Sequence, residues 1–148
     1  TYSYCLLPNH FHFMIRVKEA KFPGFEAFIS TQLNVLFSQH ALMINRERGR
    51  YGNLFCKSFK RIRINSDFYL KNLVAYIHKN PYKHRVSSDY RLYRFSSYGE
   101  IIRRQNKIVC YHEVLSLYGG MTEFIEHHED GDPLNQFLGK LVIEKAII

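Results

Sequence analysis

Apolar and polar residues alternate along two short stretches near the start of the chain, 2–7 and 11–18. A period of two is typical of β-strands, so the pattern predicts two strands joined by a turn at Pro8-Asn9. The same period places His10 and His12 together on one face of the second strand, opposite the apolar face that is expected to enter a core. The apolar members of that second stretch are Phe11, Phe13, Ile15 and Val17.

Beyond the strands, apolar residues recur at intervals of three and four. Over 25–48 this spacing predicts a long amphipathic helix whose apolar residues pack into a core. The stretch 54–64 returns to a strand-like pattern. Three short helices are expected near the C-terminal side, at 97–104, 112–118 and 122–128.

A second long helix is predicted from Asp67 to about Lys79, with Ser66 as its N-cap. Pro81 makes Asn80 the expected last residue, because a residue before proline disfavours helical geometry. Spacings of seven and four place one set of residues on a single stripe of this helix. The stripe consists of Tyr69, Leu73, Tyr76 and Asn80.

Composition indicates a basic, globular chain. Its 148 residues are 46% hydrophobic, enough for one domain with a substantial core. The formal net charge of +8 favours a polyanionic partner such as nucleic acid, although charge that serves only solubility is about as good an explanation. Basic and aromatic residues interleave between 54 and 64, which suits a strand that follows a DNA backbone or, equally, a charged edge strand. The basic residues are Lys57, Lys60, Arg61 and Arg63.

Three cysteines at wide spacing do not indicate a disulfide framework, so a reducing cytoplasm is the simpler expectation. The sequence contains no apolar run long enough to span a bilayer, and no membrane partner is expected. His78 and the pair His127-His128 are expected to be exposed to solvent on their helices.

His10, His12, Tyr76 and Asn80 form the candidate chemical group. Imidazole nitrogens and an amide oxygen suit a divalent ion such as Mn²⁺, Mg²⁺ or Zn²⁺. Tyrosine can attack a phosphate covalently, and its phenolate is a reasonable leaving group in the reverse step. Taken singly, each feature has an ordinary explanation: surface histidines, a core tyrosine and a normal helix end. The hypothesis depends on their combination.

Two segments resemble the motifs of single-tyrosine HUH transposases, and most closely the REP-associated tyrosine transposases. They are Tyr4-Cys5-Leu6-Leu7-Pro8-Asn9-His10-Phe11-His12-Phe13-Met14-Ile15 and Tyr76-Ile77-His78-Lys79-Asn80-Pro81. The resemblance implies a ferredoxin- or RRM-like α+β domain with an antiparallel sheet, helices packed on it and a helical C-terminal appendage. Residues 1–84 would be the catalytic core and 85–148 a helical extension of the same domain.

The resemblance further implies a role for each residue of the candidate group. His10, His12 and Asn80 would bind a divalent metal, Mg²⁺ or Mn²⁺, and Tyr76 would cleave and rejoin single-stranded DNA beside hairpins through a 5′-phosphotyrosine. Members of this family carry a strand and a helix before the histidine strand, so both are expected to be missing here. An exposed strand edge would then allow a homodimer.

Two other functions also fit these residues. The chain could be a non-catalytic nucleic-acid-binding module derived from such an enzyme. It could also be a metal-dependent phosphodiesterase that uses water and only positions Tyr76.

Overall fold

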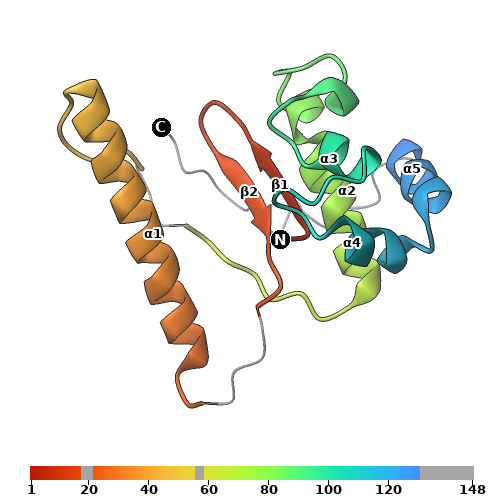
Figure 1. Ribbon diagram of the computed structural model, residues 1–148, viewed down its shortest axis with the longest axis horizontal. Coiled ribbons are helices and arrows are strands. Elements are labelled where there is room, and N and C mark those ends of the chain that lie inside the picture. Colours follow the sequence, from red (N-terminus) through yellow and green to blue (C-terminus); the bar gives the residue numbers. More distant parts are fainter. Residues whose placement is uncertain (18–21, 56–58, 131–148) are drawn as a thin grey trace.

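Two short antiparallel strands, β1 (Ser3–Leu6) and β2 (Phe11–Met14), form the sheet of the computed structural model (Figure 1). The structure describes residues 1–17, 22–55 and 59–130. The register pairs Cys5 with His12, and the Leu7 N–H donates to the His10 carbonyl across the turn at 2.8 Å. Both expected strands are therefore confirmed, although each is shorter than its sequence pattern.

The helices follow in the expected order. The two long ones are α1 (Phe25–Arg48) and α2 (Asp67–Lys83). A 3₁₀ turn and three short helices complete the described chain: η1 (Tyr90–Leu92), α3 (Tyr98–Ile102), α4 (Tyr111–Tyr118) and α5 (Met121–Glu129). The α+β class, with helices packed on a small antiparallel sheet, is confirmed.

Helix α2 begins where expected but ends later. Ser66 is its N-cap, and the Ser66 hydroxyl accepts a hydrogen bond from the Tyr69 N–H at 3.1 Å. The expectation that Asn80 ends the helix is wrong, because Pro81 lies inside the last turn. Proline there removes one donor, but the His84 N–H still donates to the Asn80 carbonyl at 2.9 Å, and α2 runs on to Lys83.

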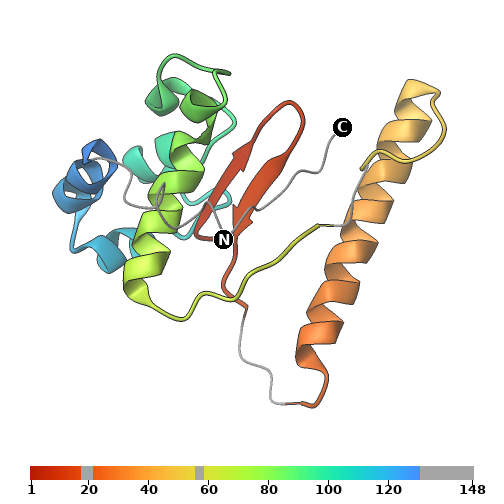
Figure 2. The same cartoon turned by 180° about the vertical axis from the view of Figure 1, so that it is seen from behind.

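The two faces of β2 differ from the expectation. His10 and His12 do share a face, but that face is buried together with Met14, whereas Phe13 and Ile15 are exposed. The physical reason is the position of α2, which packs against the hairpin on the histidine side (Figures 1 and 2). The alternation was predicted correctly, and the assignment of the core face was wrong.

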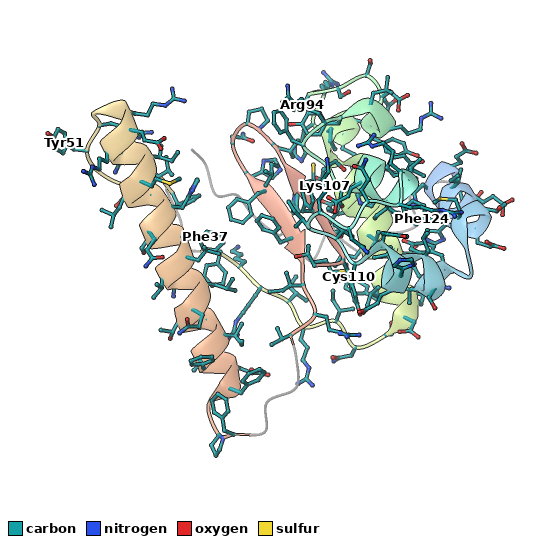
Figure 3. All side chains as sticks on the ribbon, in the orientation of Figure 1. Phe37, Tyr51, Arg94, Lys107, Cys110 and Phe124 are labelled. Atoms are coloured by element: carbon teal, nitrogen blue, oxygen red, sulfur yellow. The ribbon has the colours of Figure 1, made fainter. Side chains whose placement is uncertain are left out.

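Helix α1 lies on the other side of the hairpin from α2 and has no buried residue, so the expectation of a core helix is wrong. It touches the hairpin through Phe37, which points toward the strands (Figure 3) and lies 5.2 Å from Phe11 between ring centroids. The Phe37 ring also contacts Phe55 and Phe59. The expected strand over 54–64 is absent from its described part, 54–55 and 59–64, because no neighbouring strand pairs with it.

A buried polar network ties α2 to the C-terminal helices. His78 Nδ1 lies 2.9 Å from His128 Nε2, and His78 Nε2 lies 2.7 Å from the Ser97 hydroxyl. His128 Nδ1 lies 2.7 Å from the Phe124 carbonyl, which can only accept. One proton order therefore satisfies the chain with both imidazoles neutral: Ser97 donates to His78, His78 to His128, and His128 to the carbonyl.

The expected exposure of His78 and His128 is thus wrong. Their side chains are 0% and 1% exposed, respectively, because α5 folds back against α2 around the buried ring of Phe124. Helix periodicity within one segment cannot reveal such a contact between distant helices. In the described part of the chain, no helix is both long and apolar enough to cross a membrane.

The network predicts a loss of stability in mild acid. Burial is the main factor that holds the pKa of His128 down at about 3, and burial followed by the neighbouring His128 holds the pKa of His78 well below its usual value. The unfolded chain binds these protons near pH 6.5, so folding stability is fully present above that pH and falls as the pH decreases toward 3. For each of the two histidines, the free energy of unfolding is expected to fall by about 1.4 kcal/mol per pH unit below pH 6.5.

Urea unfolding between pH 5 and pH 8 measures this slope. The His128→Gln variant should show a flatter acid dependence than the wild type, whereas His112→Gln, which changes an exposed histidine, should keep the wild-type slope. Equal slopes in all three proteins would contradict a neutral buried network.

Candidate metal and nucleophile site

The packing of α2 on the hairpin brings the four candidate residues together. The rings of His10 and His12 lie 5.1 Å apart between centroids and are perpendicular. The His12 ring lies 6.1 Å from the Tyr76 ring, edge to face. Asn80 follows Tyr76 by one helical turn, and its side chain contacts both Tyr76 and His12. Residues more than 60 positions apart in the sequence thus meet at one place.

Among the four candidate residues, His12 combines near-complete burial with ring nitrogens that have no hydrogen-bond partner. The residue is 4% exposed, and neither ring nitrogen has a hydrogen-bond partner among the described residues. Burial, followed by electrostatic interaction with His10 and His84, lowers the pKa of His12 to about 4, and the Asn80 side chain opposes this shift. At neutral pH the ring is therefore uncharged and carries a lone pair that can bind a metal ion.

Asn80 is held by its own helix. Its Nδ2 donates to the Tyr76 carbonyl at 2.8 Å, while its buried Oδ1 has no partner within the described chain. A buried amide oxygen without a donor is costly. The Asn80 oxygen and the neutral His12 imidazole lie together at one buried place without a hydrogen bond of good geometry, and a divalent cation would satisfy both.

His10 is oriented by its neighbour in the turn. Its Nδ1 lies 2.6 Å from the Asn9 Oδ1 atom. Because an amide oxygen only accepts, Nδ1 is the donor, and in the neutral form of the ring the lone pair would then lie on Nε2. A hydrogen bond that fixes the tautomer in this way is the usual second partner of a metal-binding histidine. The His84 ring, at the end of α2, packs against His10 at 4.6 Å between centroids.

Tyr76 is half-buried, and its ring lies on the side of α2 that contacts His12 of the hairpin. Burial is the main factor that raises the pKa of its phenol above the usual value, and the nearby Tyr69 phenol adds to the shift. The Lys83 ammonium lies 4.1 Å above the centroid of the Tyr76 ring. The phenol is therefore protonated at neutral pH, and a positive charge lies against its ring.

The predicted basic residues lie on the segment between α1 and α2. Lys60 and Arg61 line a cavity of about 360 Å³ that His12 also lines. Arg61 donates to the Glu26 carbonyl at 2.8 Å, and Arg63 is 3.6 Å from the Glu26 carboxylate at the start of α1. Lys57 lies outside the described residues.

Sequence reasoning missed Lys83 and His84, because the helix was expected to end at Asn80. The spacing of seven residues between Tyr76 and Lys83 would have identified the lysine once α2 was extended. Within the described ranges, no group of three or more His, Cys, Asp or Glu side chains is arranged to hold a metal ion. The candidate site differs in that its third member is an amide.

Comparison of the chain with known proteins found no matching family model, no matching curated protein and no matching solved structure. The residues themselves therefore have to indicate the function, and here two imidazoles, an amide oxygen and a phenol converge at one place.

Buried polar atoms without hydrogen-bond partners lower the free energy of unfolding, so the site is expected to destabilise the fold when no metal is bound. His12→Phe removes two buried nitrogens while it keeps a ring of similar shape. In the presence of a chelator, this variant should be more stable than the wild type by about 1 kcal/mol in urea unfolding. Met14→Ala, on the same buried face, is the packing control and should lose about 2 kcal/mol or more. A clear loss of stability in His12→Phe would mean that the ring nitrogens are satisfied in the folded protein.

Proposed function

We propose that this chain is a metal-assisted enzyme of the single-tyrosine HUH transposase type, which cleaves and rejoins single-stranded DNA next to hairpins. Tyr76 is the nucleophile, and His10, His12 and Asn80 bind the metal ion. The observation that carries the proposal is the contact between the buried, neutral His12 and Tyr76, with the Asn80 oxygen beside them. A structural histidine buried at this place would be expected to have a hydrogen-bond partner.

The proposed reaction is a transesterification. The Tyr76 phenol loses its proton to solvent, and its oxygen attacks the phosphorus of a DNA phosphodiester. The bond from phosphorus to the 3′ oxygen breaks, and this oxygen leaves as a 3′-hydroxyl after it takes up a proton. The 5′-phosphate stays on Tyr76 as an ester, so the bond energy is kept and a 3′-hydroxyl can later reverse the step.

Each residue has a distinct task in this scheme. His12 on β2 and His10, the residue just before that strand, would bind a divalent ion such as Mg²⁺ or Mn²⁺ through their lone pairs, and Asn80 would add its Oδ1 atom. When bound, such an ion stabilises negative charge that develops on phosphate oxygens. The Lys83 ammonium, which lies on the Tyr76 ring, supplies a further positive charge at the same place.

The proposal also covers the DNA partner, the cellular location and the oligomeric state. Exposed Lys60 and Arg61 line the cavity that reaches His12, which suits the backbone of a DNA strand. A cytoplasmic location agrees with the DNA substrate. Among the described residues β2 pairs with β1 alone, so its other edge would allow a second copy of the chain to form a homodimer.

One observation favours a non-catalytic DNA-binding module instead. The phenol of Tyr76 is half-buried and its pKa is raised, which makes it a weaker nucleophile until a cation is bound. A phosphodiesterase that activates water is the third candidate, and under that hypothesis Tyr76 only positions the phosphate.

Covalent capture of DNA tests the three candidates. Single strands that carry a hairpin and randomised flanks are incubated with the protein and Mn²⁺, and adducts are counted after denaturing electrophoresis. The wild type should form an adduct, and Tyr76→Phe should reduce it at least about a hundredfold, because the phenol oxygen is the attacking atom. Tyr51→Phe, which alters a tyrosine that is 96% exposed, is the matched control and should leave the adduct unchanged.

The alternatives give different results in the same assay. A hydrolase would cleave DNA in both the wild type and Tyr76→Phe without any adduct. A binding module would retain the labelled strand but produce neither cleavage nor adduct. Either result would refute the proposed role of Tyr76.

Metal binding is tested separately from cleavage. Isothermal titration of the chelator-treated protein with Mn²⁺ should give one site, and Asn80→Ala should weaken it by about tenfold, equivalent to 1.4 kcal/mol. His112→Ala, which removes an exposed imidazole, should leave the affinity unchanged. Equal affinity in Asn80→Ala and the wild type would remove Asn80 from the site.

A further inference from the structure

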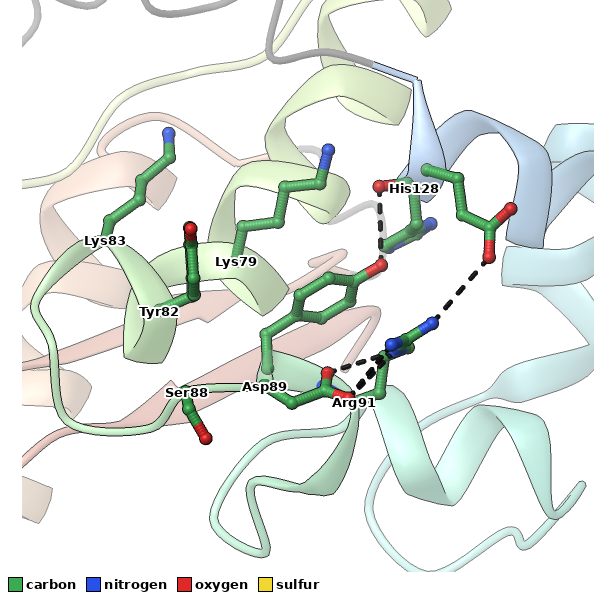
Figure 4. A pocket seen from close by; sticks show the side chains of 9 residues that line it. Lys79, Tyr82, Lys83, Ser88, Asp89, Arg91 and His128 are labelled. Atoms are coloured by element: carbon green, nitrogen blue, oxygen red, sulfur yellow. Dashed lines mark hydrogen bonds and ion pairs between the residues drawn. The ribbon is translucent and has the colours of Figure 1, made fainter.

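A second cavity adjoins the last turns of α2 and is separate from the cavity that His12 lines. It has a volume of about 640 Å³, and its walls include Lys79, Tyr82 and Lys83 from α2 and Ser88 and Tyr90 from the segment that follows (Figure 4). Figure 4 shows Lys79 and Lys83 extending from α2 in the same direction. A smaller cavity of about 490 Å³ shares Tyr82, Lys83 and Ser88 with it.

The α2 side of this cavity is its positive side. Lys79 and Lys83 are both half-buried at this wall, and the Lys79 ammonium also donates to the Asp130 carbonyl at 2.8 Å. The two carboxylates on the opposite wall are engaged by Arg91, which lies 3.0 Å from Asp89 and 3.8 Å from Glu129. Two half-buried ammonium groups one turn apart favour an anionic ligand.

An aromatic side chain stands between the two lysines in the sequence and at the same wall. Tyr82 is 61% exposed, although it lies on a well-formed helix. Nucleic-acid bases stack on such rings irrespective of base identity, and a positively charged groove beside the ring follows the backbone. The combination of Tyr82 with Lys79 and Lys83 therefore suits a nucleotide better than a free anion.

Lys83 connects this cavity with the candidate nucleophile. Its side chain lines this cavity and the smaller cavity of about 490 Å³ beside it. Its ammonium lies 4.1 Å from the centroid of the Tyr76 ring. A phosphate bound by Lys83 would therefore belong to a strand that passes close to Tyr76.

We propose that this cavity binds one nucleotide of the single-stranded DNA that flanks the phosphate attacked by Tyr76. The base stacks on Tyr82, and the phosphate lies between Lys79 and Lys83. The inference rests on the proposed function for its substrate, but its test measures binding alone.

The experiment uses a labelled 12-nucleotide single strand and fluorescence anisotropy, in the Tyr76→Phe background so that no covalent product forms. Tyr82→Ala should weaken binding by about fivefold or more through the lost stacking, with an unchanged dependence on salt. Lys83→Met should weaken binding and reduce the slope of log affinity against log salt by about 0.7, the value for one phosphate contact on a single strand. Tyr51→Ala and Lys107→Met, which alter an exposed tyrosine and an exposed lysine outside the cavity, are the matched controls.

A photo-crosslink gives a second readout that does not depend on variant folding. A strand that contains 5-iodouracil should crosslink to Tyr82, as identified by mass spectrometry of the digested protein. Crosslinks at Tyr51 with none at Tyr82, or affinities and salt slopes for Tyr82→Ala and Lys83→Met equal to those of the controls, would overturn the inference. The absence of a covalent adduct in the wild type, combined with the expected losses here, would refute the proposed enzyme and leave the nucleotide site standing.

Discussion

The packing of α2 against the histidine face of the β1–β2 hairpin is the contact on which the candidate site depends. Leu73, Val74 and Ile77 of α2 are buried in the same apolar cluster as Cys5 and Met14 of the strands. Neither element carries the chemistry alone, since the imidazoles come from the β1–β2 hairpin and the phenol and amide from α2. The apolar contacts supply the stabilisation, and the polar residues occupy positions between them.

This arrangement explains why polar atoms without partners can persist in the core. The free energy that holds α2 in place comes from apolar burial and from the His78–His128–Ser97 network on another face of the helix. His12 and Asn80 are therefore not needed to hold α2 on the hairpin. Their buried polar atoms are kept in a fixed geometry, which lowers the free energy of unfolding. A preformed site of this kind loses little conformational entropy when a ligand binds.

Sequence patterns could predict the elements but not their contacts. The period of two placed His10 and His12 on one face, and the spacing of four linked Tyr76 with Asn80, because both follow from local geometry. Which face of β2 is buried depends on α2, a helix that begins more than 50 residues later. The burial of His78 and His128 likewise depends on the contact between α5 and α2. The residue pattern within either helix does not predict that contact.

The end of α2 shows how a single local rule can hide part of a site. Proline disfavours helix at the preceding residue, but in the final turn only one backbone donor is lost, and the remaining bonds carry the helix to Lys83. That extra turn brings the Lys83 ammonium over Tyr76 and presents Tyr82 to solvent. The same helix thus has three different surfaces: one packed on the hairpin, where Tyr76 contacts His12, one tied to α5 through His78, and one that presents Tyr82 to solvent. A rigid helix held on two sides can keep the third surface in a fixed position without help from the ligand.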